Sequence, residues 1–359
     1  MKLLFLNTNI GYGGASKMLV WLANQFAEAN HEVTFVTYRE PEISQILSPK
    51  VNLMQLNTEV GSNRVLGFLN TVKRVRKVLL SNEIQIAVAF LSPSQVRLAI
   101  ASFGIKVKVV FSHRGDPYSQ YTTGKYKLIN PIINYIFGFA DVYVFQTTYA
   151  RDFYSSDIRS KSVVIPNPID PLLRTQVRYG NVQKRIVSVA RLQIWQKRQD
   201  LLIESFRLIS ERYPNYTLDL YGDGPDEDAL KQMASGNVNI RFMGRVSNVA
   251  EVIQNAAMFV LSSDFEGIPN ALLEAMSLGI PCVSTDCSPG GAAMLIKTMQ
   301  NGILVPRGNV SELANAMSFL IDNPNLAEQM GCEAMSVNQL FCSSKVFYLW
   351  SSLFEKICK

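Results

Sequence analysis

Short β-rich runs alternate with amphipathic helical patterns along the chain, and this alternation limits its fold more than any other feature. In the first half, the pattern predicts strands at Lys2–Asn7, Glu32–Thr37, Ile84–Phe90, Val107–Ser112, Val142–Gln146 and Val163–Ile165. It predicts helices between them at Ser16–Ala29, Val65–Ser81 and Lys127–Phe139. Strands that alternate with helices in this way form parallel βαβ units.

A second series of the same kind follows. Its predicted strands are Arg185–Val189, Thr217–Tyr221, Asn239–Met243, Met258–Ser262, Cys282–Thr285 and Gly302–Val305. Its predicted helices are Gln199–Arg212, Asp226–Ala234, Ile268–Leu278 and Val310–Ile321. Between the two series lies Ile165-Pro-Asn-Pro-Ile-Asp170, whose two prolines disfavour both helix and central strand. The sequence therefore predicts two doubly wound domains, with ligand sites outside the carboxyl ends of their strands and a cleft between them.

Composition excludes several classes of protein. Hydrophobic residues make up 48% and charged residues 18% of the 359 residues, which is enough apolar surface for two cores. No apolar stretch reaches the roughly 20 residues of a spanning helix, and Leu3–Leu6 is too short for a signal-peptide core. Five cysteines without a CxxC pair suit a reducing compartment, and two histidines disfavour a histidine-built zinc site. We therefore expect a cytoplasmic protein.

Positive charge is concentrated in the first half. The chain carries a net charge of +6, and residues 1–169 hold 18 Lys and Arg against 10 acids. This asymmetry indicates an anionic partner, which could be a membrane surface, a phosphorylated acceptor or nucleic acid, unless the charges are simply scattered. The basic run Lys73–Lys77 fits a helix that packs on the core with a solvated basic face, or a membrane-surface helix.

Two acids flank a predicted helix start in the second half. Glu266 and Gly267 precede Pro269, where the helix would begin, and Glu274 lies inside the helix. The free amides and the dipole of a helix N-terminus favour a phosphate. Carboxylates beside that phosphate would instead accept hydrogen bonds from sugar hydroxyls. The alternative is an ordinary helix with a solvent-facing acid.

Two further loops carry candidate ligand-binding residues. Arg191 and Lys197 flank the loop after a strand, where they could clamp a diphosphate, although a solvated basic loop is also compatible with the pattern. Trp195 in that loop could be a lid or could pack on the loop.

The glycine-rich loop Asn9–Lys17 imitates a dinucleotide fingerprint, but Ser16 replaces the third glycine and no acid follows the second strand. A hydride-transfer enzyme is therefore disfavoured.

Together these residues resemble the retaining glycosyltransferases of family 4, which are glycosyl transferases of group 1 and share the GT-B fold. The motifs that carry the resemblance are the Gly13-Gly14 loop, Ile165–Asp170, Arg191 with Lys197, Gly222-Asp-Gly-Pro225, Gly244-Arg-Val246 and Glu266 with Glu274. The resemblance implies two Rossmann-like domains that face each other across a cleft. Residues 1–169 would bind the acceptor and residues 170–340 the nucleotide sugar, and residues 341–359 would form a helix that returns to the first domain.

The resemblance also implies roles for individual residues. Arg191 and Lys197 would bind the donor diphosphate, Glu266 the sugar hydroxyls, and Glu274 the ribose. His113 matches a position that often touches the donor sugar. The remaining donor-binding residues that it implies are Gly13, Gly14, Arg245, Val246, Gly267, Ile268, Pro269, Asn270 and Ala271. Relatives often carry an acid where Met294 stands, so the resemblance assigns no donor-sugar contact to this position.

The predicted function is transfer of a sugar from a nucleotide diphosphate sugar, with a UDP-sugar favoured, to an acceptor hydroxyl with retention of configuration. We expect a glycan or lipid-linked acceptor, contact with an anionic membrane surface from the cytoplasmic side, and no nucleic acid partner. No cofactor or metal is expected: Asp226–Asp228 spells a metal-binding D-x-D, but it lies at a helix start, where acids favour the dipole. A nucleotide-sugar epimerase of GT-B fold and a non-catalytic glycan- or nucleotide-binding protein are the alternatives.

Overall fold

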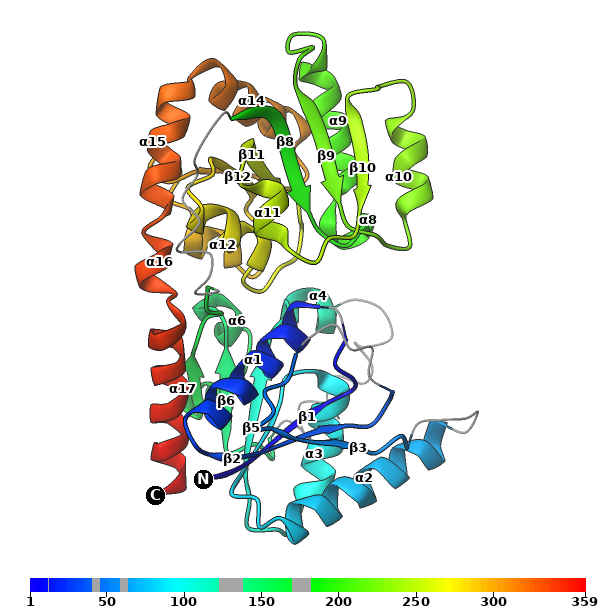
Figure 1. Ribbon diagram of the computed structural model, residues 1–359, viewed down its shortest axis with the longest axis vertical. Helices are drawn as coiled ribbons and strands as arrows, with labels where there is room; N and C mark the ends of the chain where they lie inside the picture. The colour runs from blue at the N-terminus through cyan, green and yellow to red at the C-terminus, as the bar shows by residue number, and fades with distance from the viewer. Residues whose placement is uncertain (12, 41–45, 59–63, 123–137, 170–181) are drawn as a thin grey trace. The chain divides into compact units, whose positions relative to one another are not determined.

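The computed structural model describes residues 1–11, 13–40, 46–58, 64–122, 138–169 and 182–359 (Figure 1). The chain divides into two compact units. Unit 1 comprises Met1–Pro166 together with Val346–Lys359, and unit 2 comprises Asn167–Lys345. The boundary between the two units lies between Pro166 and Asn167, inside the proline-containing segment that begins at Ile165. No described helix is both long enough and apolar enough to span a bilayer.

Unit 1 is built on a parallel sheet of seven strands in the order β3-β2-β1-β4-β5-β6-β7. The strands are β1 (Lys2–Asn7), β2 (Glu32–Thr37), β3 (Asn52–Gln55), β4 (Ile86–Ala89), β5 (Lys108–His113), β6 (Val142–Phe145) and β7 (Ser162–Val164). The described helices are α1 (Gly14–Glu28), α2 (Arg64–Ser81), α3 (Ser92–Ser102), α4 (Pro117–Thr122), α6 (Thr148–Asp152), α7 (Ser156–Ser160) and α17 (Ser343–Cys358). The strand order reverses between β1 and β4, which is where open sheets of this kind bind ligands.

The apolar runs of unit 1 form strands because helices cover both faces of the sheet. Leu3–Leu6 of β1 is buried completely, as expected for a central parallel strand. The C-terminal helix α17 contributes Trp350 and Phe354 to the core of unit 1, and Phe354 stacks on Phe26 with ring centroids 4.7 Å apart. The helix predicted within residues 341–359 thus begins at Ser343, and its residues from Val346 onward belong to unit 1.

Unit 2 is built on a parallel sheet of six strands in the order β10-β9-β8-β11-β12-β13. The strands are β8 (Gln183–Val189), β9 (Thr217–Tyr221), β10 (Ile240–Gly244), β11 (Ala256–Leu261), β12 (Cys282–Thr285) and β13 (Ile303–Val305). The helices are α8 (Ile194–Lys197), α9 (Gln199–Ser210), α10 (Glu227–Ala234), α11 (Val249–Ile253), α12 (Asn270–Ser277), α13 (Gly291–Leu295), α14 (Val310–Asp322), α15 (Pro324–Ala334) and α16 (Val337–Leu340). The strand order reverses between β8 and β11, so ligands are expected at the carboxyl ends of these two strands.

A buried ion cluster joins three strands of unit 2. Asp219 on β9 is fully buried and accepts hydrogen bonds from Nε of Arg185 on β8 and Nε of Arg241 on β10, both at 2.6 Å. Burial raises the pKa of Asp219, but the bonds from Arg241 and Arg185 outweigh it and lower that pKa below its ordinary value of 3.8. The carboxylate is therefore a stabilising part of the sheet in its charged form.

The structure contains every predicted strand and adds β3. This strand lies at the sheet edge and reads Asn-Leu-Met-Gln, so it lacks the continuous apolar run that marks the inner strands. The predicted helix Lys127–Phe139 lies mostly outside the described residues. Helices α3 and α15 went unpredicted because each mixes polar with small residues. Both have a proline in the first turn, which is a favoured position at a helix start.

Candidate functional site

The two loops that carry most of the predicted site lie at the strand-order reversal of unit 2. The β8 loop (residues 190–198) follows β8 and includes Arg191 and Lys197. The β11 loop (residues 262–269) follows β11 and includes Glu266. Because β8 and β11 are hydrogen-bonded neighbours in a parallel sheet, both loops leave the same edge. The fold thereby brings together side chains that are about 70 residues apart in the sequence.

The glycines of Gly222-Asp-Gly-Pro225 allow that segment to approach the β8 loop closely. A Cβ atom on Gly222 would lie 1.9 Å from the carbonyl oxygen of Ala190, and one on Gly224 would lie 2.1 Å from that of Leu192. No side chain fits at such distances. These glycines therefore help to fix the backbone that presents Arg191 and Lys197.

Asp226 supports the β8 loop through its side chain. Its Oδ2 accepts a hydrogen bond of 2.7 Å from the backbone amide of Ile194, at the start of α8. In the same D-x-D run, Glu227 forms an ion pair with Lys231 one helical turn later. Within the described ranges, no group of three or more His, Cys, Asp or Glu side chains could hold a metal ion. Asp226 thus has a structural contact, and the metal-free expectation stays a prediction.

Lys197 and Glu266 form an ion pair across the two loops. The Nζ atom of Lys197 donates to Oε1 of Glu266 at 2.5 Å, and Oε1 also accepts from Oγ of Ser263 at 2.9 Å. Both side chains are mostly buried, with 17% and 12% of their surface exposed. The structure therefore joins the predicted diphosphate cation directly to the predicted sugar-binding acid. An ammonium donor and a carboxylate acceptor stand side by side, able to bind a ligand that carries both phosphate and hydroxyl groups.

The N-terminus of α12 lies immediately after the β11 loop. Its N-cap is Pro269, which supplies no side-chain cap, so the first-turn amides lack that partner as well as an intrahelical one. A Cβ atom on Gly291 would come within 1.5 Å of the carbonyl oxygen of Gly267, so a glycine at 291 is needed for this turn. Asn270 accepts a bond of 2.6 Å from Asn167 of the proline-containing segment. This rigid helix start favours an anion beside Ile268 and Ala271.

Four other predicted site residues occupy the same unit with different surroundings. Glu274 is partly buried on α12, just over one turn from the helix start. Arg245 is half-exposed and forms a bidentate pair with Asp223, at 3.0 Å and 2.6 Å, and this pair lowers the pKa of Asp223. Val246 is partly buried against the core. The Arg191 side chain is exposed and, within the described part of the chain, forms no salt bridge.

The predicted residues Gly13, Gly14 and His113 belong to unit 1. Gly13 is the N-cap of α1, with a φ of 141° and open space where a Cβ would be, and Gly14 begins the helix. His113 ends β5, with its ring 5.4 Å from that of Tyr154 and 6.2 Å from that of Phe145. Burial lowers the pKa of His113 to about 4, so its ring is neutral near pH 7. Its contact with a donor sugar stays a prediction.

The sequence interpretation missed several residues that build the site. Ser263 bonds Glu266, Asn167 bonds Asn270, and Arg198 bonds Asp264 across the two loops. The polar run Ser262-Ser-Asp264 directly after an apolar strand was the available signal. Its partners were not predictable, because they depend on which strands are neighbours.

Two doubly wound parallel sheets, with a cation–carboxylate pair beside a helix N-terminus in the second, are the features that the sequence resemblance implies for a glycosyltransferase of the GT-B fold. Two family models match the chain: the model described as Glycosyltransferase Family 4 matches residues 12–172, and the model described as Glycosyl transferases group 1 matches residues 183–323. Together they account for most of the chain. The protein belongs to the group 1 glycosyltransferases, as its sequence motifs predicted.

Individual relatives agree with this assignment. An uncharacterized glycosyltransferase of Haemophilus influenzae is 25% identical over 361 residues, which cover 98% of this chain and 99% of the relative. The Campylobacter jejuni enzyme named GalNAc-alpha-(1->4)-GalNAc-alpha-(1->3)-diNAcBac-PP-undecaprenol alpha-1,4-N-acetyl-D-galactosaminyltransferase is 22% identical, with 99% of each chain covered. The crystal structure of Anabaena HepE in complex with UDP matches with a TM-score of 0.80 at 20% identity, over 99% of this chain and 100% of that one. The predicted GT-B fold is confirmed.

Proposed function

We propose that the protein transfers a sugar from a nucleotide diphosphate sugar, with a UDP-sugar favoured, to an acceptor hydroxyl with retention of configuration. The Lys197–Glu266 pair beside the N-terminus of α12 is the observation that carries this proposal. UDP is favoured because the HepE structure, which shares this fold, was determined in complex with UDP.

The proposed chemistry begins with an exchange of partners at this pair. The donor diphosphate takes the ammonium of Lys197 and the first amides of α12, and the sugar hydroxyls donate to the freed carboxylate of Glu266. Arg191, which is exposed on the same loop, adds a second cation as negative charge develops on the leaving diphosphate. Fixed cations and amides thus take the role that a bound metal has in other transferases.

Retention is supported by the family resemblance. No side chain among the predicted site residues is assigned as a dedicated base on the acceptor, so the leaving phosphate is the proposed proton acceptor. Glu266 binds sugar hydroxyls in this scheme.

A lipid-linked acceptor at a membrane surface is the finer part of the proposal. The name of the Campylobacter jejuni relative contains PP-undecaprenol, which supports an acceptor of this class. Helix α2 exposes Val65, Leu66 and Leu69 at its start, and Lys73 and Lys77 are exposed further along the same helix. Apolar and basic side chains on one helix favour an anionic bilayer.

Two of the four basic residues in the run Lys73–Lys77 have structural contacts instead. Arg74 donates to the carbonyl oxygen of Leu56 at 2.9 Å, and Arg76 donates to those of Ala101 and Phe103 at 3.0 Å and 2.6 Å. The proposed membrane contact therefore depends on Lys73 and Lys77.

A panel of nucleotide sugars tests the proposal. The protein is incubated with UDP-glucose, UDP-galactose, UDP-N-acetylglucosamine, UDP-N-acetylgalactosamine and GDP-mannose, and products are followed by NMR. Release of nucleoside diphosphate by wild type, with at least about a hundredfold loss in Lys197→Ala or Arg191→Ala, is expected. A donor converted to its epimer without release would identify an epimerase instead, and absence of both turnover and nucleotide binding would refute the proposal. The anomer of the product, read by NMR, decides between retention and inversion.

A further inference from the structure

Arg198 connects α8 to α9 in a backbone conformation that is uncommon for its residue type. Its φ of 50° and ψ of 43° lie in the left-handed region, which favours glycine. A non-glycine residue keeps such a conformation only where its surroundings hold it there. Arg198 directly follows Lys197, so whatever holds Arg198 also fixes the backbone from which the Lys197 side chain projects.

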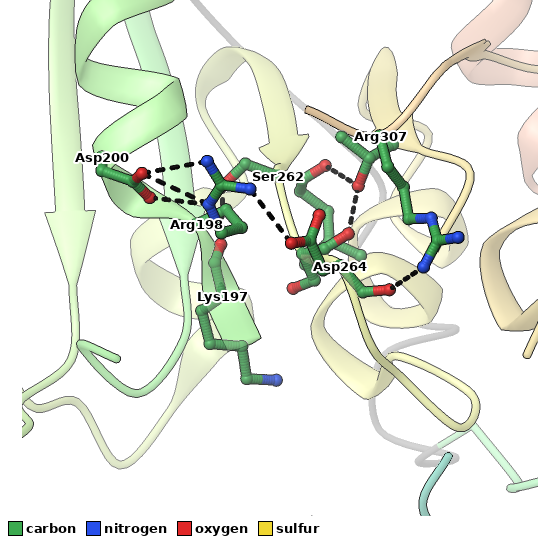
Figure 2. A network of polar contacts seen from close by, with 9 residues as sticks. Lys197, Arg198, Asp200, Ser262, Asp264 and Arg307 are labelled. Carbon is green, nitrogen blue, oxygen red and sulfur yellow. Dashed lines mark hydrogen bonds and ion pairs between the residues drawn. The ribbon is translucent and has the colours of Figure 1, made fainter. Parts of the chain in front are cut away.

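The guanidinium of Arg198 bonds two carboxylates on different elements (Figure 2). Its Nε and Nη2 donate to Asp200, in the first turn of α9, at 3.1 to 3.2 Å. Its Nη1 donates to Oδ2 of Asp264, in the β11 loop, at 3.0 Å. One side of the guanidinium therefore binds its own helix, and the other side binds the loop that carries Glu266.

Uncharged hydrogen bonds join the same two loops. Oγ of Ser262 donates to the carbonyl oxygen of Lys197 at 2.8 Å, and the amide of Asp264 donates to that of Gln196 at 2.8 Å. Nε2 of Gln196 donates to the carbonyl oxygen of Phe265 at 3.0 Å. The Lys197 side chain extends away from this network in Figure 2. The contacts hold the backbone of Lys197 without touching its ammonium group.

We propose that Arg198 is a positioning residue, which holds Lys197 beside Glu266 by bonding Asp264 across the two loops. A lysine side chain has four rotatable bonds, so its ammonium is placed accurately only when its backbone is fixed. The left-handed turn at Arg198 sets the direction of that side chain, and the bond to Asp264 holds the turn against the β11 loop. The expected effect of Arg198 on sugar transfer rests on the proposed function, in which Lys197 binds the donor. Its effect on the position of the Lys197 ammonium does not depend on that function.

Four variants separate the backbone, the charge and the two carboxylates. Arg198→Gly removes the guanidinium but keeps a residue that adopts the left-handed conformation readily. Arg198→Lys keeps the charge but loses the planar fork. Asp264→Asn weakens the bond across the loops, and Asp200→Asn is its matched control, since it weakens only the bond within α9.

The first readout is the acetylation rate of Lys197 by acetic anhydride, measured by mass spectrometry with Lys50 of unit 1 as the internal reference. In Arg198→Gly and Asp264→Asn we expect Lys197 to be acetylated several times faster than in wild type, because its ammonium leaves Glu266 more often. Asp200→Asn should retain the wild-type rate, and Arg198→Lys should be intermediate. Lys50, which pairs with Glu28 at 2.7 Å and is about half exposed, should react at one rate throughout and so normalises the reagent dose between samples.

The second readout is transfer with the donor found in the nucleotide-sugar panel, together with UDP affinity by calorimetry. We expect kcat in Arg198→Gly and Asp264→Asn to fall by about tenfold or more, since misplacement by 1 Å can cost ~10²-fold. KM should change less than kcat. Unchanged Lys197 acetylation in both variants would refute the positioning role, as would equal effects of Asp200→Asn and Asp264→Asn. If wild type neither turns over a donor nor binds UDP, the proposed function fails, but the acetylation experiment still decides the role of Arg198.

Discussion

Replacing Glu266 by alanine should separate UDP binding from sugar transfer. In the free protein Lys197 is bonded to Glu266 at 2.5 Å, so in the proposed scheme the diphosphate competes with that carboxylate for the ammonium. Removal of Glu266 leaves Lys197 without this competitor. In the same scheme, the sugar hydroxyls of a complete donor lose their acceptor. We therefore expect the variant to bind UDP at least as tightly as wild type while transferring sugar more slowly.

The magnitudes follow from the two side chains. A hydrogen bond to a charged group contributes about 1.5 to 3 kcal/mol, and the pair is only 12% to 17% exposed, so solvent screens it weakly. In wild type, the new bond from Lys197 to the diphosphate offsets part of the free energy lost when Lys197 leaves Glu266. The release of Lys197 should thus tighten UDP binding by up to about tenfold, or roughly 1.4 kcal/mol. Loss of the hydroxyl contact should lower kcat by tenfold or more, on the scale of about 1.5 to 3 kcal/mol.

Calorimetric titration with UDP and NMR assays of transfer measure the two effects separately. Glu266→Gln is the conservative control, because it keeps an acceptor for Ser263 but lacks the charge that holds Lys197. Glu274→Ala is the contrasting variant, which should weaken UDP and donor alike if Glu274 binds the ribose. Equal losses of UDP affinity in Glu266→Ala and Glu274→Ala would contradict the assignment of Glu266 to the sugar.

Three further outcomes are expected. Transfer should continue in EDTA, and abolition of transfer by EDTA with recovery on Mg²⁺ would contradict this. Transfer should also depend on Lys197: Lys197→Arg should keep more activity than Lys197→Ala but less than wild type, because the planar guanidinium does not replace the point charge of the ammonium. In sedimentation with anionic vesicles, wild type should be captured at low salt and released at high salt. The double variant with Lys73→Gln and Lys77→Gln should lose capture, whereas the control Lys50→Gln should not. Capture of the double variant would show that α2 is not the membrane contact. Asp219 has a pKa lowered below 3.8 in the folded protein, so its contribution to stability is present above that pH and is lost as the pH falls through the folded pKa. Thermal unfolding at pH 7, 5 and 3 should show a smaller acid-induced loss for Asp219→Asn than for wild type, and equal losses would show that this carboxylate is not responsible.

The elements that sequence reasoning predicted accurately are those with strong local patterns. Strands β1, β2, β9 and β12 have the predicted bounds, because each is rich in apolar or β-branched residues and is followed by polar or turn residues. Helix α12 was expected from Ile268 and begins at Asn270, two residues after the predicted start. The edge strand β3 was missed, because its four residues bury little surface and depend on β2 for their conformation.

For the candidate site, too, local sequence patterns identified residues but not the contacts between them. Arg191, Lys197, Glu266 and Glu274 were identified from motif spacing and from their positions after strands or at a helix start. That Lys197 bonds Glu266, and that Arg245 bonds Asp223, could not be predicted, because these contacts depend on the order of strands in the sheet. Asp226 was not expected to bind a metal, and its bond to the amide of Ile194 became visible only in the folded chain.

By itself the sequence determined the class of fold and the residue types available for chemistry, because hydrophobic periodicity and proline restrictions act over a few residues. The tertiary structure decided which of those residues act together. Arg198 illustrates the reason: in the sequence it is one more cation in a basic loop, whereas its bond to Asp264 exists only because β11 lies beside β8. Contacts between residues 66 to 69 positions apart are set by strand pairing and close packing, which no local pattern encodes.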